Sequence, residues 1–197
     1  PLLVPSTSSL SFNGSTEYVA TTFEATGNTA MTFSAYIYLD EDFETRGAII
    51  GSNFANSAAV ALNINPDRKL ELFIRNSGGN PGYLVANTAM NLSQWYHVAV
   101  TFSNNGTNND ITFYLDGSVD NTTGSTQAYG QGQNLSATGV PYSIGTNVSA
   151  FVSPYNYFKG KIDEVMIWDN VISTSNITTL ANAVGSGNIV NPEQLST

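Results

Sequence analysis

Cysteine, histidine and charged side chains are scarce in this 197-residue sequence: it contains no cysteine, one histidine and 11% charged residues. The absence of cysteine excludes disulfides and thiolate metal sites. Six lysines and arginines stand against 15 aspartates and glutamates, and the resulting net charge of −9 argues against nucleic acid as a partner. No apolar run approaches the roughly 20 residues of a membrane-spanning helix, so we expect no membrane insertion.

The residue patterns of an active site are also missing. His97 is the only histidine, and no cysteine or obvious Ser-His-Asp arrangement accompanies it, which favours a structural role. Residues 40–44 carry four carboxylates, but their spacing is wrong for a glycosidase pair and no apolar setting is present to raise a pKa. This run is typical of a solvated loop, with a second cation site as the alternative. We therefore expect no catalytic residues and no enzymatic activity.

The polar residues that the sequence does contain are mostly asparagine, serine, threonine and glycine. We associate this composition with secreted or particle-surface β proteins. The expected location is therefore extracellular, on a cell surface or on a virion surface. The acidic balance is compatible with calcium as a cofactor.

Alternating apolar and polar positions predict an all-β fold. Residues 31–39 place apolar side chains at every second position, which is the pattern of a half-buried strand. Residues 60–64 and 70–74 repeat this alternation on either side of a turn sequence, and therefore predict a hairpin. Residues 95–102 and 111–115 are two further segments rich in β formers.

The end of the sequence predicts one short helix. Ser173 and its two neighbours are good N-caps, and apolar residues follow at helical spacing as far as Val184. We divide the chain into an N-terminal arm at residues 1–8, a β-sandwich domain at residues 9–184, and a C-terminal tail or linker at residues 185–197.

The stretch FKGKIDEVMIW at residues 158–168 is predicted to be a central strand. Strict alternation places Asp163 in line with Val165 and Ile167 on the core face. Ile162, Met166 and Trp168 fall with Glu164 on the other face, which the C-terminal helix is expected to cover. A carboxylate on a core-facing row needs hydrogen bonds, a paired charge or a cation, so Asp163 is held either by backbone amides or by a metal ion.

Candidate ligand-binding residues lie in loops and on one outward-facing row. Arg75, Asn76 and Tyr83 belong to a Gly- and Pro-rich segment whose side chains suit hydrogen bonding to a polar ligand, although a plain connecting loop is the alternative. Outward tyrosines could stack on sugar rings, unless loops cover them. The remaining candidates are Tyr36, Tyr38, Tyr155 and Tyr157. We expect both tryptophans, Trp95 and Trp168, to be buried in the core or under loops, and the alternative for Trp95 is a place on the outward aromatic face.

Five short stretches resemble a known family: LSFNG at residues 10–14, QWYHVAVT at 94–101, FYLDG at 113–117, SIG at 143–145, and the stretch at 158–168. In this order they are similar to laminin-G-like domains of the concanavalin A-like lectin/glucanase superfamily. The resemblance implies a jelly-roll sandwich of two antiparallel sheets, often with a structural calcium ion at its rim. Carried over to this sequence, the calcium ligands would be Asp163, Asn13 and backbone carbonyls around Gly14.

The resemblance does not imply a single function. Glucanases of the superfamily typically carry a Glu-X-Asp-X-X-Glu motif on one strand, and this motif is absent. We therefore expect a noncatalytic binding module, carbohydrate-binding or adhesive, whose partner is a glycan or a surface protein. The alternative is a structural protein, such as a virion decoration or surface spike domain, that assembles into an oligomer or larger particle through its terminal arms.

Overall fold

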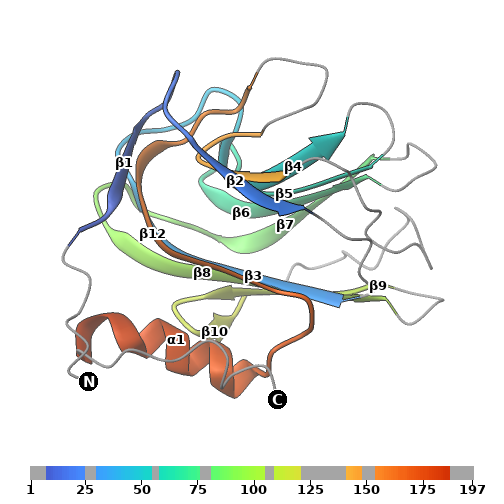
Figure 1. Cartoon of the computed structure of the whole chain (residues 1–197). Helices are drawn as coiled ribbons and strands as arrows, with labels where there is room; N and C mark the ends of the chain where they lie inside the picture. The colour runs from blue at the N-terminus through green and yellow to red at the C-terminus, as the bar shows by residue number, and fades with distance from the viewer. Residues whose placement is uncertain are drawn as a thin grey trace.

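Two six-stranded antiparallel sheets and one helix make up the part of the chain that the structure describes, and the computed structural model is shown in Figure 1. The described residues are 8–24, 30–54, 58–75, 81–104, 109–120, 141–147 and 154–186. The predicted all-β jelly-roll sandwich with one short C-terminal helix is confirmed. The domain limits at residues 9 and 184 stay a prediction.

The two sheets combine strands from distant parts of the sequence. Sheet A consists, in spatial order, of β1 (Leu10–Asn13), β12 (Lys159–Trp168), β3 (Ala30–Leu39), β8 (Trp95–Asn104), β9 (Asn109–Leu115) and β10 (Ser118–Val119). Sheet B consists of β2 (Val19–Glu24), β11 (Pro141–Ile144), β4 (Gly47–Phe54), β5 (Ala58–Ile64), β6 (Lys69–Arg75) and β7 (Pro81–Ala89).

The hydrophobic core lies between the two sheets. Apolar residues at every second position of a strand point to one face, so each strand contributes one buried row. The rows predicted for β3, β5 and β6 are confirmed. They bury Met31, Phe33, Ile37 and Leu39 from β3, Val60, Leu62 and Ile64 from β5, and Leu70, Leu72 and Ile74 from β6.

Helix α1 (Thr174–Ser186) packs on the outer face of sheet A, on the side away from sheet B (Figure 1). The Ser173 side chain caps it by accepting a hydrogen bond from the Asn176 backbone amide at 3.2 Å. Ile177 and Leu180 bury against Trp168, which confirms that Trp168 is buried and lies under the helix. In the described part of the chain, no helix is long and apolar enough to cross a membrane.

The faces predicted for β12 are wrong at Ile162 and Asp163 and right from Val165 onward, because the strand contains a β-bulge between these two parts. Asp163 pairs with Tyr36 and Met166 pairs with Ser34, so two residues of β12 lie opposite one residue of β3. Glu164 takes the left-handed conformation, with φ of 47°. As a result Ile162 faces the sandwich core, and Val165 and Ile167 follow it there after the bulge. Asp163 lies on the outer face instead, where it is partly exposed and accepts a hydrogen bond from the Glu164 amide at 2.9 Å.

Candidate functional site

Two cross-strand rows form the outer face of sheet B. One row runs from Gly51 through Ala61 and Phe73 to Tyr83, and Asn63 and Glu71 form a neighbouring pair. These residues alternate with the core-facing rows of β5 and β6, so they point away from the sandwich interior. We call this group, together with Arg46 and Asn147, the sheet B face.

Tyr83 presents an aromatic ring at one end of the sheet B face. Its side chain is 47% exposed and packs on Phe73, which is buried, with ring centroids 4.8 Å apart. On the other side, the guanidinium carbon of Arg46 lies 4.3 Å from the Tyr83 ring centroid, which is within the range of a cation–π contact. Contacts with both neighbours therefore hold the Tyr83 ring in place while part of it stays open to solvent.

Arg46 is fixed by a buried carboxylate. Glu71 is 2% exposed and accepts hydrogen bonds from Nε of Arg46 and, at 3.2 Å, from Nη2. The hydrogen bond to Glu71 raises the pKa of Arg46 above its ordinary value. A buried carboxylate without a partner is costly, so Glu71 favours the conformation in which Arg46 is paired with it. The two hydrogen bonds of this pair orient the guanidinium over Tyr83.

Asn63 and Asn147 add polar groups to the same face. Nδ2 of Asn147 donates a hydrogen bond to Oδ1 of Asn63 at 3.3 Å, and both side chains are buried. Asn63 lies directly beside Glu71 in the register of β5 and β6. Among the described residues, Oδ1 of Asn147 has no hydrogen-bond partner, and this acceptor lies against Gly51 of β4.

Two of the predicted ligand-binding residues lie on or beside this face. Tyr83 is part of it, and Tyr155 adjoins it through two backbone hydrogen bonds with Asn147, at 3.0 and 3.3 Å. Arg75 is the last residue of β6 and pairs with Ala59 and Pro81, but its side chain lies outside what the structure describes. Asn76 also lies outside the described residues.

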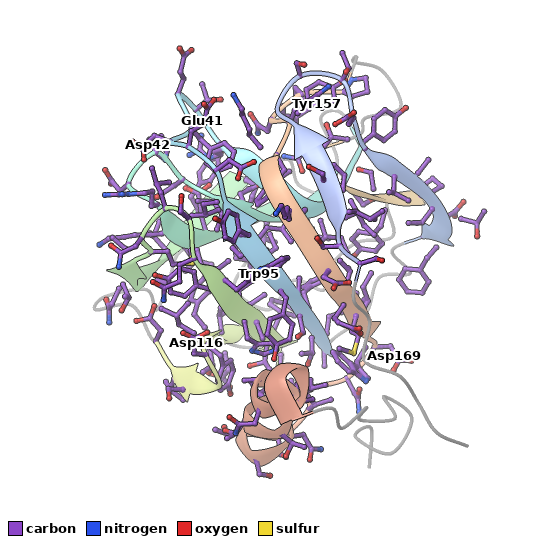
Figure 2. The ribbon with its side chains drawn as sticks, turned by 90° about the vertical axis from the view of Figure 1, so that its left-hand side faces the viewer. Glu41, Asp42, Trp95, Asp116, Tyr157 and Asp169 are labelled. Atoms are coloured by element: carbon purple, nitrogen blue, oxygen red, sulfur yellow. The ribbon has the colours of Figure 1, made fainter. Side chains whose placement is uncertain are left out.

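Tyr157 lies at another part of the molecule. Its ring centroid is 6.5 Å from that of Tyr18, and Figure 2 shows it at the end of the sandwich near β1. The structure therefore does not bring Tyr157 together with Tyr83, and the predicted ligand-binding residues do not form one site.

Tyr36 and Tyr38 lie on the outer face of sheet A. The prediction that Tyr36 is exposed is wrong, because its hydroxyl donates to the carbonyl oxygens of Leu180 and Ala181 in α1 and its side chain is 8% exposed. Tyr38, one row further along β3, is partly buried and contacts Trp95. Trp95 is 40% exposed, so the prediction that it is buried is wrong as well.

The three residues proposed as calcium ligands do not converge. Asn13 pairs with Lys159, whereas Asp163 lies four residues further along β12, about 13 Å away at the rise of a strand. Calcium binds oxygens at about 2.3–2.6 Å, so one ion cannot join both side chains. Oδ1 of Asn13 instead accepts hydrogen bonds from the backbone amides of Ser15 and Thr16 in the turn after Gly14. Calcium binding itself stays a prediction.

Among the described residues, no group of three or more histidine, cysteine, aspartate or glutamate side chains could hold a metal ion. The acidic run at residues 40–44 is mostly exposed, as predicted, but Phe43 is buried and packs on Phe158. Glu41 and Asp42 reach basic side chains: Lys159 at 2.6 Å and Arg68 at 3.5 Å. Each of these two carboxylates therefore has a basic partner at the protein surface.

His97 is buried under α1. Its Nε2 lies 2.8 Å from the Ser34 hydroxyl, but both side chains are at most 2% exposed, so the pair has no access to a substrate. Burial lowers the pKa of His97 to about 4. The structural role predicted for this histidine is the one that its surroundings support.

The residues of the sheet B face that sequence analysis missed are Arg46, Asn63, Glu71 and Asn147. Glu71 did carry a signal, because it is the charged outward position within an otherwise apolar strand pattern. No local pattern connects it with Arg46, which is 25 residues away in the sequence.

Comparison with known proteins concerns the fold. The laminin G family described as the concanavalin A-like lectin/glucanases superfamily matches residues 13–178. No curated protein matches the chain in sequence.

Solved structures similar to this chain include a heptameric SAP-like pentraxin from Limulus polyphemus, at 20% identity and a TM-score of 0.66, covering 90% of this chain and 83% of the pentraxin. Domain 4 of an extracellular arabinanase from Geobacillus stearothermophilus, in complex with arabinotriose, is 18% identical with a TM-score of 0.65, covering 88% of this chain and 76% of that one. The CBM40 module of a Ruminococcus gnavus sialidase, bound to α2,3-sialyllactose, is 14% identical with a TM-score of 0.62, covering 85% and 97%. At these identities the likeness shows the fold alone.

Proposed function

The chain belongs to the concanavalin A-like lectin/glucanase superfamily, and we propose that it is a noncatalytic carbohydrate-binding module whose ligand binds at the sheet B face. The observation that carries this proposal is the half-exposed ring of Tyr83, which Phe73 and Arg46 hold in place. The family membership predicted from the sequence is confirmed by the match over residues 13–178.

The sheet B face has the chemistry that a sugar needs. An aromatic ring takes the C–H face of a pyranose or furanose, while planar donors and amide oxygens take its hydroxyls. Arginine has five N–H donors, and Glu71 is the hydrogen-bond partner of Arg46 among the described residues and takes two of them, which leaves the others for a ligand. Because the ion pair fixes the guanidinium before binding, little side-chain entropy is lost when a ligand arrives.

A noncatalytic role is supported by the pairing of the carboxylate on this face. Glu71 is held by Arg46 in two hydrogen bonds, so it is unsuited to exchange a proton with a substrate. Two of the similar structures were solved with saccharides bound, arabinotriose in one and sialyllactose in the other. We propose an extracellular or surface location, in line with the polar, weakly charged composition.

The test is a glycan array of neutral and acidic oligosaccharides, probed with wild type and two variants in calcium and in chelator. Tyr83→Ala removes the exposed ring and should abolish binding to the glycans that wild type retains. Phe23→Ala is the matched control, because Phe23 is 45% exposed on β2, the opposite edge strand of the same sheet. Wild type that binds no glycan, or Tyr83→Ala that binds like wild type, would contradict the proposed site.

The alternative of a structural or virion decoration protein stays a prediction. Residues 1–7 and 187–197, which make up most of the terminal arms on which it depends, lie outside the described residues. Sedimentation analysis separates the two functions, because a stable oligomer without glycan binding would favour assembly over carbohydrate recognition.

A further inference from the structure

The outer face of sheet A carries an aromatic and basic cluster beside the helix. Tyr38 is the central residue, since it pairs with Trp95 on β8 and with Lys161 on β12. The neighbouring row, which contains Tyr36 and His97, lies under α1. In Figure 2, Trp95 lies over the middle of the sheet and above α1 in the view.

Contacts within the cluster fix its geometry. The rings of Trp95 and Tyr38 lie 5.6 Å apart at 60°, which is an edge-to-face arrangement. Nζ of Lys161 lies 5.0 Å from the centroid of the Tyr38 ring, within the range of a cation–π contact. All three residues come from adjacent central strands of sheet A, so a ligand would meet them on a rigid support.

Lys161 differs from the neighbouring lysine in its partners. Lys159 forms an ion pair with Glu41 at 2.6 Å, whereas no described carboxylate lies within 4.0 Å of Lys161. In a chain with 15 acidic and six basic residues, Lys161 is therefore a cation that has no carboxylate partner among the described residues. Its positive charge is available to an anionic group of a ligand.

We propose that Trp95, Tyr38 and Lys161 form a second saccharide site, selective for an acidic sugar. The sugar ring stacks on the open face of Trp95, and its carboxylate accepts a hydrogen bond from Lys161. This site lies on the opposite side of the sandwich from the sheet B face, so it does not rest on the function proposed above. A chain with both sites binds saccharides on two faces.

A protein partner fits the cluster less well than a sugar. The buried centre of a protein interface is more apolar than the rest of the surface, and the exposed large hydrophobic side chains among the described residues come from seven different strands and loops. They are Leu10, Tyr18, Phe23, Tyr83, Trp95, Val119 and Val171. An isolated exposed tryptophan beside a tyrosine and a lysine has the mixed character of a sugar site.

The experiment follows the two indole N–H signals in ¹H–¹⁵N spectra of the whole chain. Trp95 is exposed and Trp168 is buried under α1, so only the Trp95 signal should move on titration with tetragalacturonic acid. The fully methyl-esterified tetrasaccharide is the uncharged probe, and it should bind at least ~5-fold more weakly because it offers no carboxylate to Lys161. Raising the salt concentration should weaken binding of the acid but not of the ester.

Four variants assign the roles. Lys161→Gln should reduce affinity for the acid to that for the ester, while Lys69→Gln, which makes the same charge change on sheet B, should leave both affinities unchanged. Trp95→Ala should weaken both about 10-fold or more, read from the Lys161 signals. Tyr83→Ala should leave the Trp95 titration unchanged, so failure of this site and failure of the sheet B site are distinguishable.

Four outcomes would overturn the proposal. The Trp95 signal does not move with either sugar, the acid and the ester bind equally well, or Lys161→Gln and Lys69→Gln have the same effect. The fourth is a Trp95 signal that shifts with protein concentration in the absence of sugar, because this would make the cluster a contact between copies of the chain.

Discussion

The amide oxygen of Asn147 lies where a side chain at Gly51 would begin: a Cβ built on Gly51 would be 2.1 Å from Oδ1. The absence of a side chain at Gly51 therefore allows Asn147 to lie across β4 and reach Asn63. A glycine within a strand often marks such a close approach.

Gly51→Ala should destabilise the fold by about 1–3 kcal/mol, because the new methyl group forces Asn147 out of its position. The double variant Gly51→Ala/Asn147→Ala should recover part of this loss, since the side chain that clashes is gone. Urea unfolding of the wild type, both single variants and the double variant gives the coupling free energy. Additive losses in the double variant would show that the two positions do not interact.

Removing Arg46 from the ion pair should lower the free energy of unfolding more than neutralising Glu71. Arg46→Ala leaves the buried Glu71 carboxylate unpaired, and we expect a loss of about 2 kcal/mol, below the range of roughly 3–5 kcal/mol for fully buried pairs because Arg46 is partly exposed. Glu71→Gln keeps a hydrogen-bond acceptor and should cost less. Urea unfolding measures both, and a larger loss in Glu71→Gln would contradict this assignment.

Stability should fall with decreasing pH through the titration of His97. Burial lowers the folded-state pKa from 6.5 to about 4, so between these values the unfolded chain binds a proton that the folded chain does not. The folded state therefore loses stability as pH falls through this window, by about 3 kcal/mol in total.

The measurement is urea unfolding of the wild type and of His97→Gln between pH 7 and pH 4. Carboxylates contribute to the pH dependence of both proteins, so the difference between the two curves isolates the histidine. This difference should shrink as the pH falls. A constant difference across the window would show that His97 is protonated equally in the folded and unfolded states.

The fold could be predicted from sequence because its signals are local and repeated. The alternation of residues 31–39 survives in β3, and the capping residue Ser173 begins the helix. The faces of Ile162 and Asp163 could not be predicted, because the bulge at Glu164 puts one extra residue of β12 opposite Ala35 and no sequence pattern marks it.

The sites were less predictable because their exposure depends on distant segments. Tyr36 and Tyr38 look equivalent in sequence, yet only Tyr36 lies under α1, which is contributed by residues about 145 positions later. Trp95 lies at the first position of β8, beyond the part of the sheet that the helix covers. Likewise, Tyr83 could be named from composition, while its contact with Arg46 required the structure.

Any increase of the melting temperature by calcium should not depend on Asp163. The residue lies about 13 Å along β12 from the position opposite Asn13, so the two side chains cannot bind one ion. We expect the difference in melting temperature between calcium and chelator to be the same in wild type and in Asp163→Asn. Differential scanning calorimetry in both conditions measures it, with Asp169→Asn as a matched control at an exposed carboxylate just past β12. Loss of a calcium-dependent shift in Asp163→Asn alone would restore Asp163 as a ligand, because an ion that binds only the folded state raises the melting temperature by mass action.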